Sequence, residues 1–464
     1  MARVPDAEAV VDLGCGERLT YAALWRRASA VAGGLVEAGI TPGARVGVAL
    51  PNGAAWTVAF LGILLAAAVP VPINPRLTTG ERRHIVEDCG ADLVIDGELP
   101  HGGPIERDAS DPESLAALFY TSGTTGRPKG AMLSHRALLS AAEQVRQAYR
   151  LGADDGLRSL VAGPLFHVLA SGMQWIPALV SGGCVVIMPS FEVGTWVRAI
   201  GDEQIEALNG VPAMFWQALR HPDFRDVDVS GVRILSYGAA PTPPAQALAL
   251  REAFPGARLA PGYGLTEAPC VTGLQDHDAL MHAGSVGTAV ADTELGLIGP
   301  EADQGIGQLI VRGPQVMSGY WGNSSATTEA LVDGWLHTGD IVRIDDGGRV
   351  FMLDRRTDLI NRGGENVYSV EVEAALAAYP AVAESAVVAV SDERLGSRVA
   401  VCVVARPGVD FDPEQLVRVA REGLASFKVP ELICLRTEPL PRNAAGKVDK
   451  DAVREVSEWS PLPR

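Results

Sequence analysis

Residues 54–73 read AAWTVAFLGILLAAAVPVPI and contain no charged side chain. An uncharged run of this length is just long enough to cross a bilayer as a helix. However, Gly62 and two prolines interrupt the run, and much of it is alanine, which is only weakly apolar. We therefore predict a buried helix over 54–68 followed by a buried strand over 69–73, and no membrane span.

The flanking sequence continues an alternation of helix and strand. On the N-terminal side, ARVGVAL (44–50) has the apolar character of a strand. On the C-terminal side, Thr78 and Glu81 form a capping-box pattern for a helix that ends at Gly90, and ADLVI (91–95) is the next strand. This alternation predicts an α/β fold built on mostly parallel, doubly wound sheets.

The last third of the chain has a different pattern. Short strands separated by turn residues over 296–353 predict a small antiparallel or β-barrel-like unit. A boundary follows near DRRTD (354–358), after which helices and strands form a compact α+β pattern. We therefore expect an N-terminal domain over 1–354 and a smaller C-terminal domain over 355–464, with a frayed tail at 457–464.

Composition and charge narrow the classes of function. The chain has 464 residues, and its 39 basic and 56 acidic side chains give a net charge of −17, which repels nucleic acid and anionic lipid. The six cysteines are far apart, so neither disulfides nor a structural metal is expected. Because free thiols suit a reducing compartment and MARVPDAEAV does not resemble a signal peptide, we expect a cytoplasmic protein.

A loop rich in glycine and hydroxyl groups, TSGTTGRPKG (121–130), follows the apolar strand pattern LAALFY (115–120). Glycines let backbone N–H groups approach an anion, the hydroxyls donate hydrogen bonds, and a lysine supplies positive charge. No Ser or Thr follows the lysine, so this is not the P-loop of NTPases, and a flexible turn is the alternative interpretation. The candidate phosphate-binding residues are Thr121, Ser122, Gly123, Thr124, Thr125, Gly126 and Lys129.

The motif GYGLTEA (262–268) places an aromatic ring, a hydroxyl and a carboxylate close together. Tyr263 can stack on a nucleotide base, Thr266 can donate to a phosphate oxygen, and Glu267 can hold Mg²⁺. The alternative interpretation is a loop with a surface glutamate. Read by itself, the motif therefore predicts a nucleotide site without excluding a plain loop.

Together these motifs resemble the signatures of the AMP-forming adenylating enzymes, which include acyl- and aryl-CoA synthetases, peptide adenylation domains and luciferases. The signatures occur in the order typical of that family and cover about Arg18 to Lys450, and the chain is most similar to the fatty-acyl and aryl-acid CoA ligases. The further signatures are PLFH (164–167), YGAAP (237–241), DGWLHTGD (333–340), NRGGENVYSVEVE (361–373) and LPRNAAGKVDK (440–450).

The resemblance implies a role for each matching residue. It implies that the catalytic residues are Lys447, His167, Thr266 and Glu267, with Lys447 bridging the substrate carboxylate and the α-phosphate and Glu267 holding Mg²⁺. It also implies that Asp340 binds the ribose hydroxyls and that Arg355 contacts ribose or phosphate. The implied AMP site further includes Gly238, Ala239, Ala240, Tyr263 and Gly264, and the implied CoA-binding loop is Arg362, Gly363 and Gly364.

The residues after His167 bear on the identity of the acid. Amino-acid-activating relatives usually place an aspartate in this region, whereas residues 167–174 contain no carboxylate, so an α-amino acid is disfavoured. No arginine or lysine is present there to pair with a second carboxylate, which disfavours diacids. The candidate residues of an apolar substrate pocket are Leu169, Met173, Val211 and Cys270, each of which can equally be plain core.

The resemblance implies a two-step reaction that uses ATP, Mg²⁺ and CoA. We expect a ligase that converts an apolar carboxylic acid, fatty or aryl, to an acyl-adenylate and then to an acyl-CoA. A ligase that loads an acyl carrier protein and a non-catalytic acyl or nucleotide binder are the alternatives, and the sequence leaves a homodimer open. In the family a mobile C-terminal domain turns at a hinge that is usually Asp or Lys; here it is Thr357, whose stiff β-branched side chain predicts a slower rotation.

Overall fold

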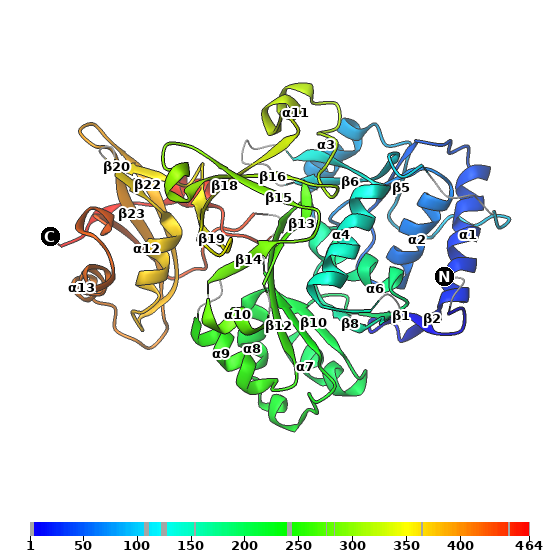
Figure 1. The fold of residues 1–464 in the computed structure, drawn as a ribbon, viewed down its shortest axis with the longest axis horizontal. Helices are drawn as coiled ribbons and strands as arrows, with labels where there is room; N and C mark the ends of the chain where they lie inside the picture. The colour runs from blue at the N-terminus through cyan, green and yellow to red at the C-terminus, as the bar shows by residue number, and fades with distance from the viewer. Residues whose placement is uncertain are drawn as a thin grey trace. The chain divides into compact units, whose positions relative to one another are not determined.

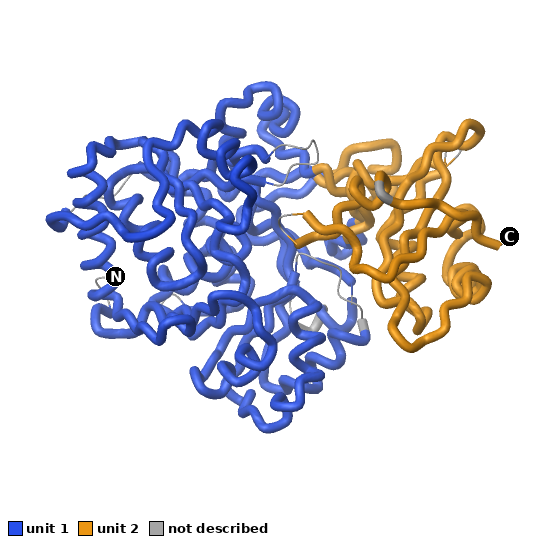
Figure 2. The backbone as a smooth tube through the Cα atoms, turned by 180° about the vertical axis from the view of Figure 1, so that it is seen from behind, with its two compact units in different colours: residues 1–296, 310–338, 344–351 blue, residues 297–309, 339–343, 352–464 orange. Residues whose placement is uncertain are grey.

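The computed structural model describes residues 4–105, 111–121, 128–152, 155–238, 244–274, 276–282, 284–362, 365–443 and 446–463. The chain divides into two compact units (Figure 2). Unit 1 comprises residues 1–296, 310–338 and 344–351, and unit 2 comprises residues 297–309, 339–343 and 352–464.

The core of unit 1 is a large sheet whose central strands are parallel, as the sequence predicts (Figure 1). The sheet becomes antiparallel at one side, where β12 pairs with β13 and β13 pairs with β14. In sheet order the strands are β2 (Glu17–Thr20), β1 (Glu8–Asp12), β9 (Cys184–Ile187), β8 (Arg158–Val161), β10 (Ala207–Gly210), β11 (Ile234–Tyr237), β12 (Arg258–Leu265), β13 (Ala268–Gly273) and β14 (Ser285–Ala289).

Helices cover this sheet and bury large side chains against it. Trp196 on α7 and Phe215 on α8 are fully buried and pack edge-to-face, with ring centroids 5.6 Å apart. Burial of such aromatic side chains is a major source of stability for a sheet of this size. These helices are α6 (Ile176–Val180), α7 (Val193–Asp202), α8 (Pro212–Ala218), α9 (Pro244–Ala253) and α10 (Asp276–Met281), and α11 (Ser324–Ala330) also belongs to unit 1.

The N-terminal helices and strands confirm the predicted alternation. The stretch 54–73 folds as α2 (Ala54–Leu65) followed by β4 (Val69–Pro72), both largely buried. The capping box of Thr78 and Glu81 starts α3 (Thr79–Cys89), and Gly90 ends it in a left-handed conformation. The other members are α1 (Tyr21–Glu37), β3 (Arg45–Val48) and β5 (Leu93–Ile95), and the three strands form a parallel sheet in the order β4-β3-β5.

The strand after the glycine-rich loop, β7 (Lys129–Ser134), was not predicted from the sequence. β6 (Leu115–Thr121) is followed by β7, and the two form an antiparallel pair in which Thr121 lies opposite Lys129. Ser134 then caps α4 (His135–Ala148), as expected. The glycine-rich loop therefore joins the two strands of a hairpin, and a strand separates it from the helix.

The predicted barrel-like unit is wrong. β15 (Glu294–Ile298), β16 (Ile306–Arg312), β18 (Trp335–Ile344) and β19 (Val350–Arg355) follow one another in an open order, and β19 pairs with β14. Short β17 (Leu331–Val332) pairs with β18. The described strands thus extend the large sheet and do not close on themselves, because β19 pairs with the edge of β14. The sequence of 296–353 does not indicate this pairing, since β14 lies outside that range.

The C-terminal part of unit 2 is the predicted α+β structure. In its sheet, β22 (Val382–Asp392) and β23 (Gly396–Ala405) are antiparallel, and β24 (Leu432–Arg436) runs parallel to β23. The remaining elements are β20 (Ile360–Arg362), β21 (Glu365–Val367), α12 (Ser369–Leu376), α13 (Pro413–Gly423) and α14 (Lys450–Val456).

The predicted frayed tail is wrong for residues 460–462. β25 (Ser460–Pro461) pairs with β24, and the backbone N–H of Leu462 donates to the carbonyl of Glu431 at 2.9 Å. The side chain of Leu462 is buried in the core of unit 2. A single buried leucine anchors this short segment although its proline is untypical of a strand.

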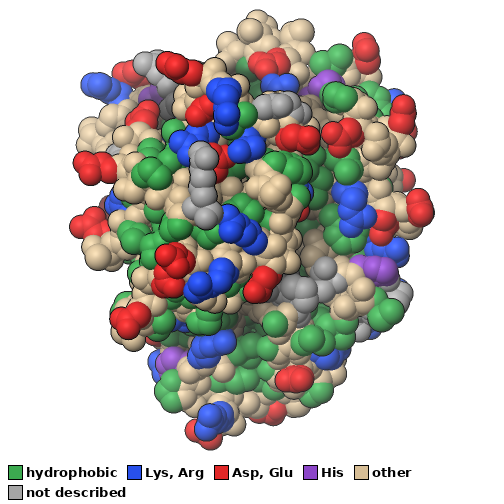
Figure 3. Space-filling view, turned by 90° about the vertical axis from the view of Figure 1, so that its left-hand side faces the viewer, with side chains coloured by type: hydrophobic (Ala, Val, Ile, Leu, Met, Phe, Trp, Pro, Cys, Tyr) green, Lys and Arg blue, Asp and Glu red, His purple; other side chains and the backbone are tan. Residues whose placement is uncertain are grey.

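The surface carries both signs of charge. On the face shown in Figure 3, basic side chains lie among acidic ones. Among the described residues, no helix combines the length and the hydropathy that crossing a bilayer requires.

Candidate active site

The tip of the β12–β13 hairpin holds three of the predicted site residues. Tyr263 lies on β12, and Thr266 and Glu267 form the turn that leads into β13, all three half-buried. The strands approach so closely that a Cβ atom at Gly264 would lie 1.9 Å from the carbonyl oxygen of Pro269, so only glycine fits there. Gly238, directly after β11, is similarly confined, because a Cβ atom would lie 2.6 Å from the carbonyl oxygen of Gly262.

Glu267 belongs to a group that brings distant parts of the sequence together. The hydroxyl of Tyr320 donates a hydrogen bond to Oε1 of Glu267 at 2.7 Å. The ring of the same tyrosine lies 5.3 Å from Nζ of Lys129, a cation–π distance. The structure therefore joins the predicted metal-binding carboxylate to the predicted phosphate-binding lysine through a residue that the sequence motifs do not include.

Tyr320 is held in place by its neighbours. Its backbone forms a β-bridge with Ala131 of β7, and its N–H donates a hydrogen bond to the hydroxyl of Thr327 at 2.9 Å. Burial and the negative charge of Glu267 raise the pKa of Tyr320, so the phenol stays neutral and remains a donor. The sequence signal for this residue is weak, because Tyr320 lies far from the GYGLTEA motif along the chain.

The phosphate-loop prediction falls partly outside the described residues. Thr121 and Lys129, at the two ends of the loop, are paired across the hairpin. The other candidates, Ser122, Gly123, Thr124, Thr125 and Gly126, lie outside the described residues, as do Ala239 and Ala240 of the predicted adenine site.

His167 is the N-cap residue of a short helix, α5 (Val168–Ala170). Its backbone carbonyl accepts hydrogen bonds from the N–H groups of Ala170 and Ser171, and its ring packs on Phe166 with 4.7 Å between centroids. A π-helical segment, Ser171–Trp175, continues α5 directly. Since α5 packs against β12, the helix start lies in the same unit as the hairpin tip.

The four predicted pocket residues have different surroundings. Met173 and Cys270 lie together, because Met173 packs on the buried cluster that contains Cys270. Burial raises the pKa of the Cys270 thiol to about 12, so the thiol stays protonated and unreactive. Val211 is half-buried before α8, and Leu169 is 39% exposed on α5.

Asp340 and Arg355 form an ion pair within unit 2. Nε of Arg355 lies 3.3 Å from Oδ1 of Asp340, whose side chain is buried whereas that of the arginine is half exposed. The backbone N–H of Arg356 also donates to the carbonyl of Gly339 at 2.9 Å. Two residues that the sequence assigns to ribose binding are therefore neighbours, and the carboxylate is the better shielded of the two.

Lys447 lies on the expected glycine-containing turn and its backbone is well fixed. Its N–H donates to Oδ1 of Asn443 at 3.1 Å, its carbonyl accepts from the N–H of Asn443 at 2.8 Å, and Gly446 adopts a positive φ of 79°. The side chain of Lys447 is exposed. Because the backbone of Lys447 is hydrogen-bonded, its exposed side chain can present a positive charge with little further loss of entropy at that residue.

The predicted CoA loop and hinge also lie in unit 2. Arg362 donates to Glu431 through Nε at 2.6 Å, and Arg398 donates to the other carboxylate oxygen at 2.8 Å. Gly363 and Gly364 lie outside the described residues. Thr357 is exposed in the turn after β19.

A buried polar network fixes the start of α12, and the sequence did not predict it. Both the backbone N–H and the hydroxyl of Ser369 donate to the carboxyl of Asp354, the latter at 2.9 Å. Lys450 donates to the same hydroxyl and pairs with Glu373 at 2.8 Å. Burial raises the pKa of Asp354, and the nearby charge of Lys450 opposes that rise.

The site therefore forms two groups. Unit 1 holds Lys129, Glu267, Tyr320, Tyr263 and the start of α5, and unit 2 holds the Asp340–Arg355 pair, the Lys447 turn and Arg362. Among the described residues, no three Asp, Glu, His or Cys side chains are arranged to hold a metal by themselves.

Comparison with known proteins identifies the family. Residues 1–321 match the family described as AMP-binding enzyme, and residues 371–447 match the AMP-binding enzyme C-terminal domain. The chain belongs to the AMP-binding enzyme family. The family predicted from the sequence motifs is thereby confirmed.

Similar sequences include enzymes that act on different acids. This AMP-binding enzyme is 38% identical to feruloyl-CoA synthase from an Amycolatopsis species, over 95% of the chain and 94% of that protein. It is 32% identical to a long-chain-fatty-acid–CoA ligase of Mycobacterium tuberculosis, over 97% of the chain and 95% of that protein. Both likenesses extend over nearly the whole length of the proteins compared.

Two solved enzyme structures are similar to this chain over nearly its whole length. The o-succinylbenzoate CoA synthetase of Bacillus subtilis, solved with its acyl-adenylate intermediate, superposes with a TM-score of 0.88 at 27% identity, covering 100% of this chain and 98% of that one. An amide bond synthetase from Marinactinospora thermotolerans superposes with a TM-score of 0.87 at 28% identity, covering 97% of each chain.

Proposed function

We propose that this AMP-binding enzyme is an acid–CoA ligase that activates an apolar carboxylic acid, fatty or aryl, with ATP and transfers the acyl group to CoA. The observation that carries the proposal is the contiguous group of Lys129, Tyr320 and Glu267, in an enzyme whose relatives over nearly their full length are CoA ligases. A lysine and a carboxylate held together in this way suit a polyphosphate substrate that carries a cation.

The chemistry needs no enzyme nucleophile. In the first step a carboxylate oxygen of the acid attacks the α-phosphorus of ATP, a new phosphorus–oxygen bond forms, and pyrophosphate leaves. In the second step the CoA thiol, losing its proton, attacks the acyl carbonyl, and AMP leaves. Catalysis then consists of positioning the reactants and stabilising charge.

The proposed roles follow the two groups of residues. In unit 1, the 121–129 loop and Thr266 bind phosphates, Tyr263 stacks on adenine, and His167 lies beside the substrate carboxylate. In unit 2, Asp340 and Arg355 bind ribose, Lys447 stabilises the transition state of adenylation, and Arg362 with its glycines serves the CoA step. We assign the first set and Asp340 to a functional domain over 1–354, and Arg355, Lys447 and Arg362 to a mobile domain over 355–464.

Glu267 fits a role as a Mg²⁺ ligand. Its carboxylate is half-buried and oriented by Tyr320, and a carboxylate so held suits a cation that takes its other ligands from phosphates and water. When bound, the cation would neutralise charge on the phosphates. Tyr320 orients the carboxylate and Lys129 adds a second positive charge nearby.

The acceptor is tested together with the reaction. The purified protein is incubated with ATP, Mg²⁺ and a panel of fatty and aryl acids, alone or with CoA, a carrier protein or a primary amine, and the products are identified by mass spectrometry. Formation of acyl-CoA, AMP and pyrophosphate supports the proposal. If acyl-AMP reacts only with the carrier protein or only with the amine, that compound and not CoA is the acceptor. Failure of every acid to give acyl-AMP would refute the proposal.

Two variants test the assigned roles within the same assay. Lys447→Ala is expected to lose adenylation, whereas Lys428→Ala, which removes a lysine paired with Glu371 elsewhere in unit 2, is the matched control. Thr357→Lys is expected to change the ratio of the two half-reaction rates. If both rates are unchanged in Thr357→Lys, the proposed effect of threonine at the hinge is wrong.

A further inference from the structure

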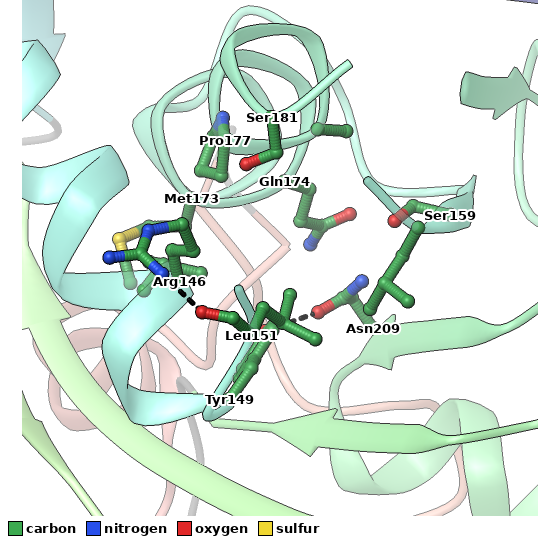
Figure 4. A pocket seen from close by; sticks show the side chains of 12 residues that line it. Arg146, Tyr149, Leu151, Ser159, Met173, Gln174, Pro177, Ser181 and Asn209 are labelled. Carbon is green, nitrogen blue, oxygen red and sulfur yellow. Dashed lines mark hydrogen bonds between the residues drawn. The ribbon is translucent and has the colours of Figure 1, made fainter. Parts of the chain in front are cut away.

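A small pocket lies in unit 1 beside the candidate substrate region (Figure 4). Its cavity of about 20 Å³ has room for a single water molecule or a group of similar size, such as a hydroxyl. The pocket lies between the end of α4, the π-helical segment 171–175 and the strands β8 and β10. No role described above uses it.

The π-helical segment sets one wall of the pocket. π-helical turns are rare and are found frequently at functional sites, because the extra residue redirects the side chains around it. Here the segment carries Met173 and Gln174 into the pocket wall. It begins directly after α5, whose N-cap is His167, so Gln174 lies seven residues after His167 in the same continuous helical stretch.

Gln174 has an unmet hydrogen-bonding requirement. The residue is 7% exposed, and its Oε1 has no hydrogen-bond partner among the described residues. A buried acceptor that lost its water without gaining a donor destabilises the protein, so such a group needs an occupant. Figure 4 shows the Gln174 amide on the side of the pocket that faces Ser159 and Asn209, which also line it.

The other polar groups of the pocket favour a neutral occupant. Arg146 is the cationic lining residue, but it pairs with Glu143 at 2.5 Å and donates to the carbonyl of Leu151. Tyr149 donates to Oδ1 of Asn209 at 2.8 Å. Because these groups already have partners, the pocket offers an amide to a neutral hydrogen-bonding group and has no free charge for a second carboxylate.

We propose that this pocket binds a hydroxyl group at the end of the acid remote from its carboxylate, and that Gln174 is a specificity-determining residue for such hydroxylated acids. A hydroxyl fits either orientation of the amide, because it both donates and accepts. The apolar contact of Met173 with the Cys270 cluster suits the rest of the acid. The inference rests on the proposed ligase function and adds the class of acid to it.

The test compares pairs of acids of equal length that differ by one terminal hydroxyl, in straight-chain and arylpropanoic series. We expect the wild-type enzyme to prefer the hydroxylated member at least tenfold in kcat/KM, since a site built to bind a hydroxyl rejects the analogue that lacks it. Gln174→Leu, which keeps the size of the side chain, is expected to remove that preference and to leave the plain acids nearly unaffected. Gln217→Leu, at an exposed position of α8, is the matched control.

The outcomes separate this inference from the function on which it rests. Equal use of both members of each pair by the wild type, or an equal slowing of all acids in Gln174→Leu, would mean that the pocket holds only a structural water, and would overturn the inference while the ligase function stands. If no acid is turned over, the proposed function fails. The inference is then decided by acid-induced shifts in melting temperature, where a hydroxyl preference lost in Gln174→Leu supports it and equal shifts overturn it.

Discussion

Removing the hydroxyl of Tyr320 tests whether it orients Glu267 for adenylation. The phenol donates to a carboxylate at 2.7 Å, and a hydrogen bond to a charged group is worth about 1.5–3 kcal/mol. Both residues are half-buried, so the lower end of that range applies, and 1.4 kcal/mol corresponds to about a tenfold change in rate. We therefore expect Tyr320→Phe to lower the adenylation rate about tenfold and to raise the Mg²⁺ concentration needed for half-maximal rate.

A second substitution of Tyr320 tests the contribution of its aromatic ring. Phenylalanine keeps the ring that faces Lys129, whereas Tyr320→Leu removes both the hydroxyl and the cation–π contact. Such a contact contributes about 0.5–1 kcal/mol at an exposed site, so Tyr320→Leu should be slower than Tyr320→Phe by a further factor of about two to five. A leucine variant no slower than the phenylalanine variant would show that the ring does not support Lys129.

The assay is pyrophosphate release with a saturating acid, measured over a range of Mg²⁺ concentrations. Tyr21→Phe is the control, because Tyr21 is buried in the same unit and its hydroxyl donates only to the backbone carbonyls of Leu179 and Gly183. It should lose thermal stability without a change in Mg²⁺ dependence. Wild-type rates and Mg²⁺ dependence in Tyr320→Phe would refute the orienting role.

Three further predictions concern single residues. Lys447→Ala should lower adenylation by roughly a hundredfold with little change in the melting temperature, because the side chain is exposed, and pyrophosphate release measures this. Leu462→Ala should lower the free energy of unfolding by about 2–5 kcal/mol in urea titration, since it leaves a cavity in a closed core. The pKa of Glu192 is lowered to about 2 by hydrogen bonds from the Thr195 hydroxyl, the Thr195 backbone N–H and the N–H of Gly194. The stability that the Glu192 carboxylate contributes is therefore present above pH 4.5 and is lost as the pH falls toward 2. The melting-temperature difference between wild type and Glu192→Gln should accordingly shrink over that range, and a constant difference would contradict this.

Local signals explain which parts of the fold the sequence could predict. The bounds of α3 followed from Thr78, Glu81 and Gly90, because a capping box and a left-handed glycine act within one turn of the helix. β7 was missed, because its strand character comes from pairing with β6, and KGAMLS has no strong strand pattern by itself. The prediction of a barrel-like unit was wrong for the same reason. Whether a sheet closes depends on strand edges that are distant in the sequence, here the edge of β14 with which β19 pairs.

The site shows the same division between local and distant information. Motifs such as GYGLTEA nominate residues that lie side by side in the chain, and the structure does place Thr266 and Glu267 in one turn. Tyr320 has no motif of its own, and only the folded chain reveals its contact with Glu267. Gln174 is likewise an ordinary residue until the π-helical segment buries its amide.

The contact between Asp354 and Ser369 limits how this part of the chain can bend. It joins the end of β19 to the first residue of α12, so residues 355–368 form a loop whose two ends are tied together. Thr357 lies inside that loop, and a reorientation at this residue either stays within the loop or separates its ends. Separation would remove both Ser369 donors from the buried Asp354 carboxyl and leave it the backbone N–H of Arg355, at about 1.5–3 kcal/mol for each lost bond to a charged group. Such a reorientation would therefore add the loss of the Ser369 contact to the resistance of the Thr357 side chain.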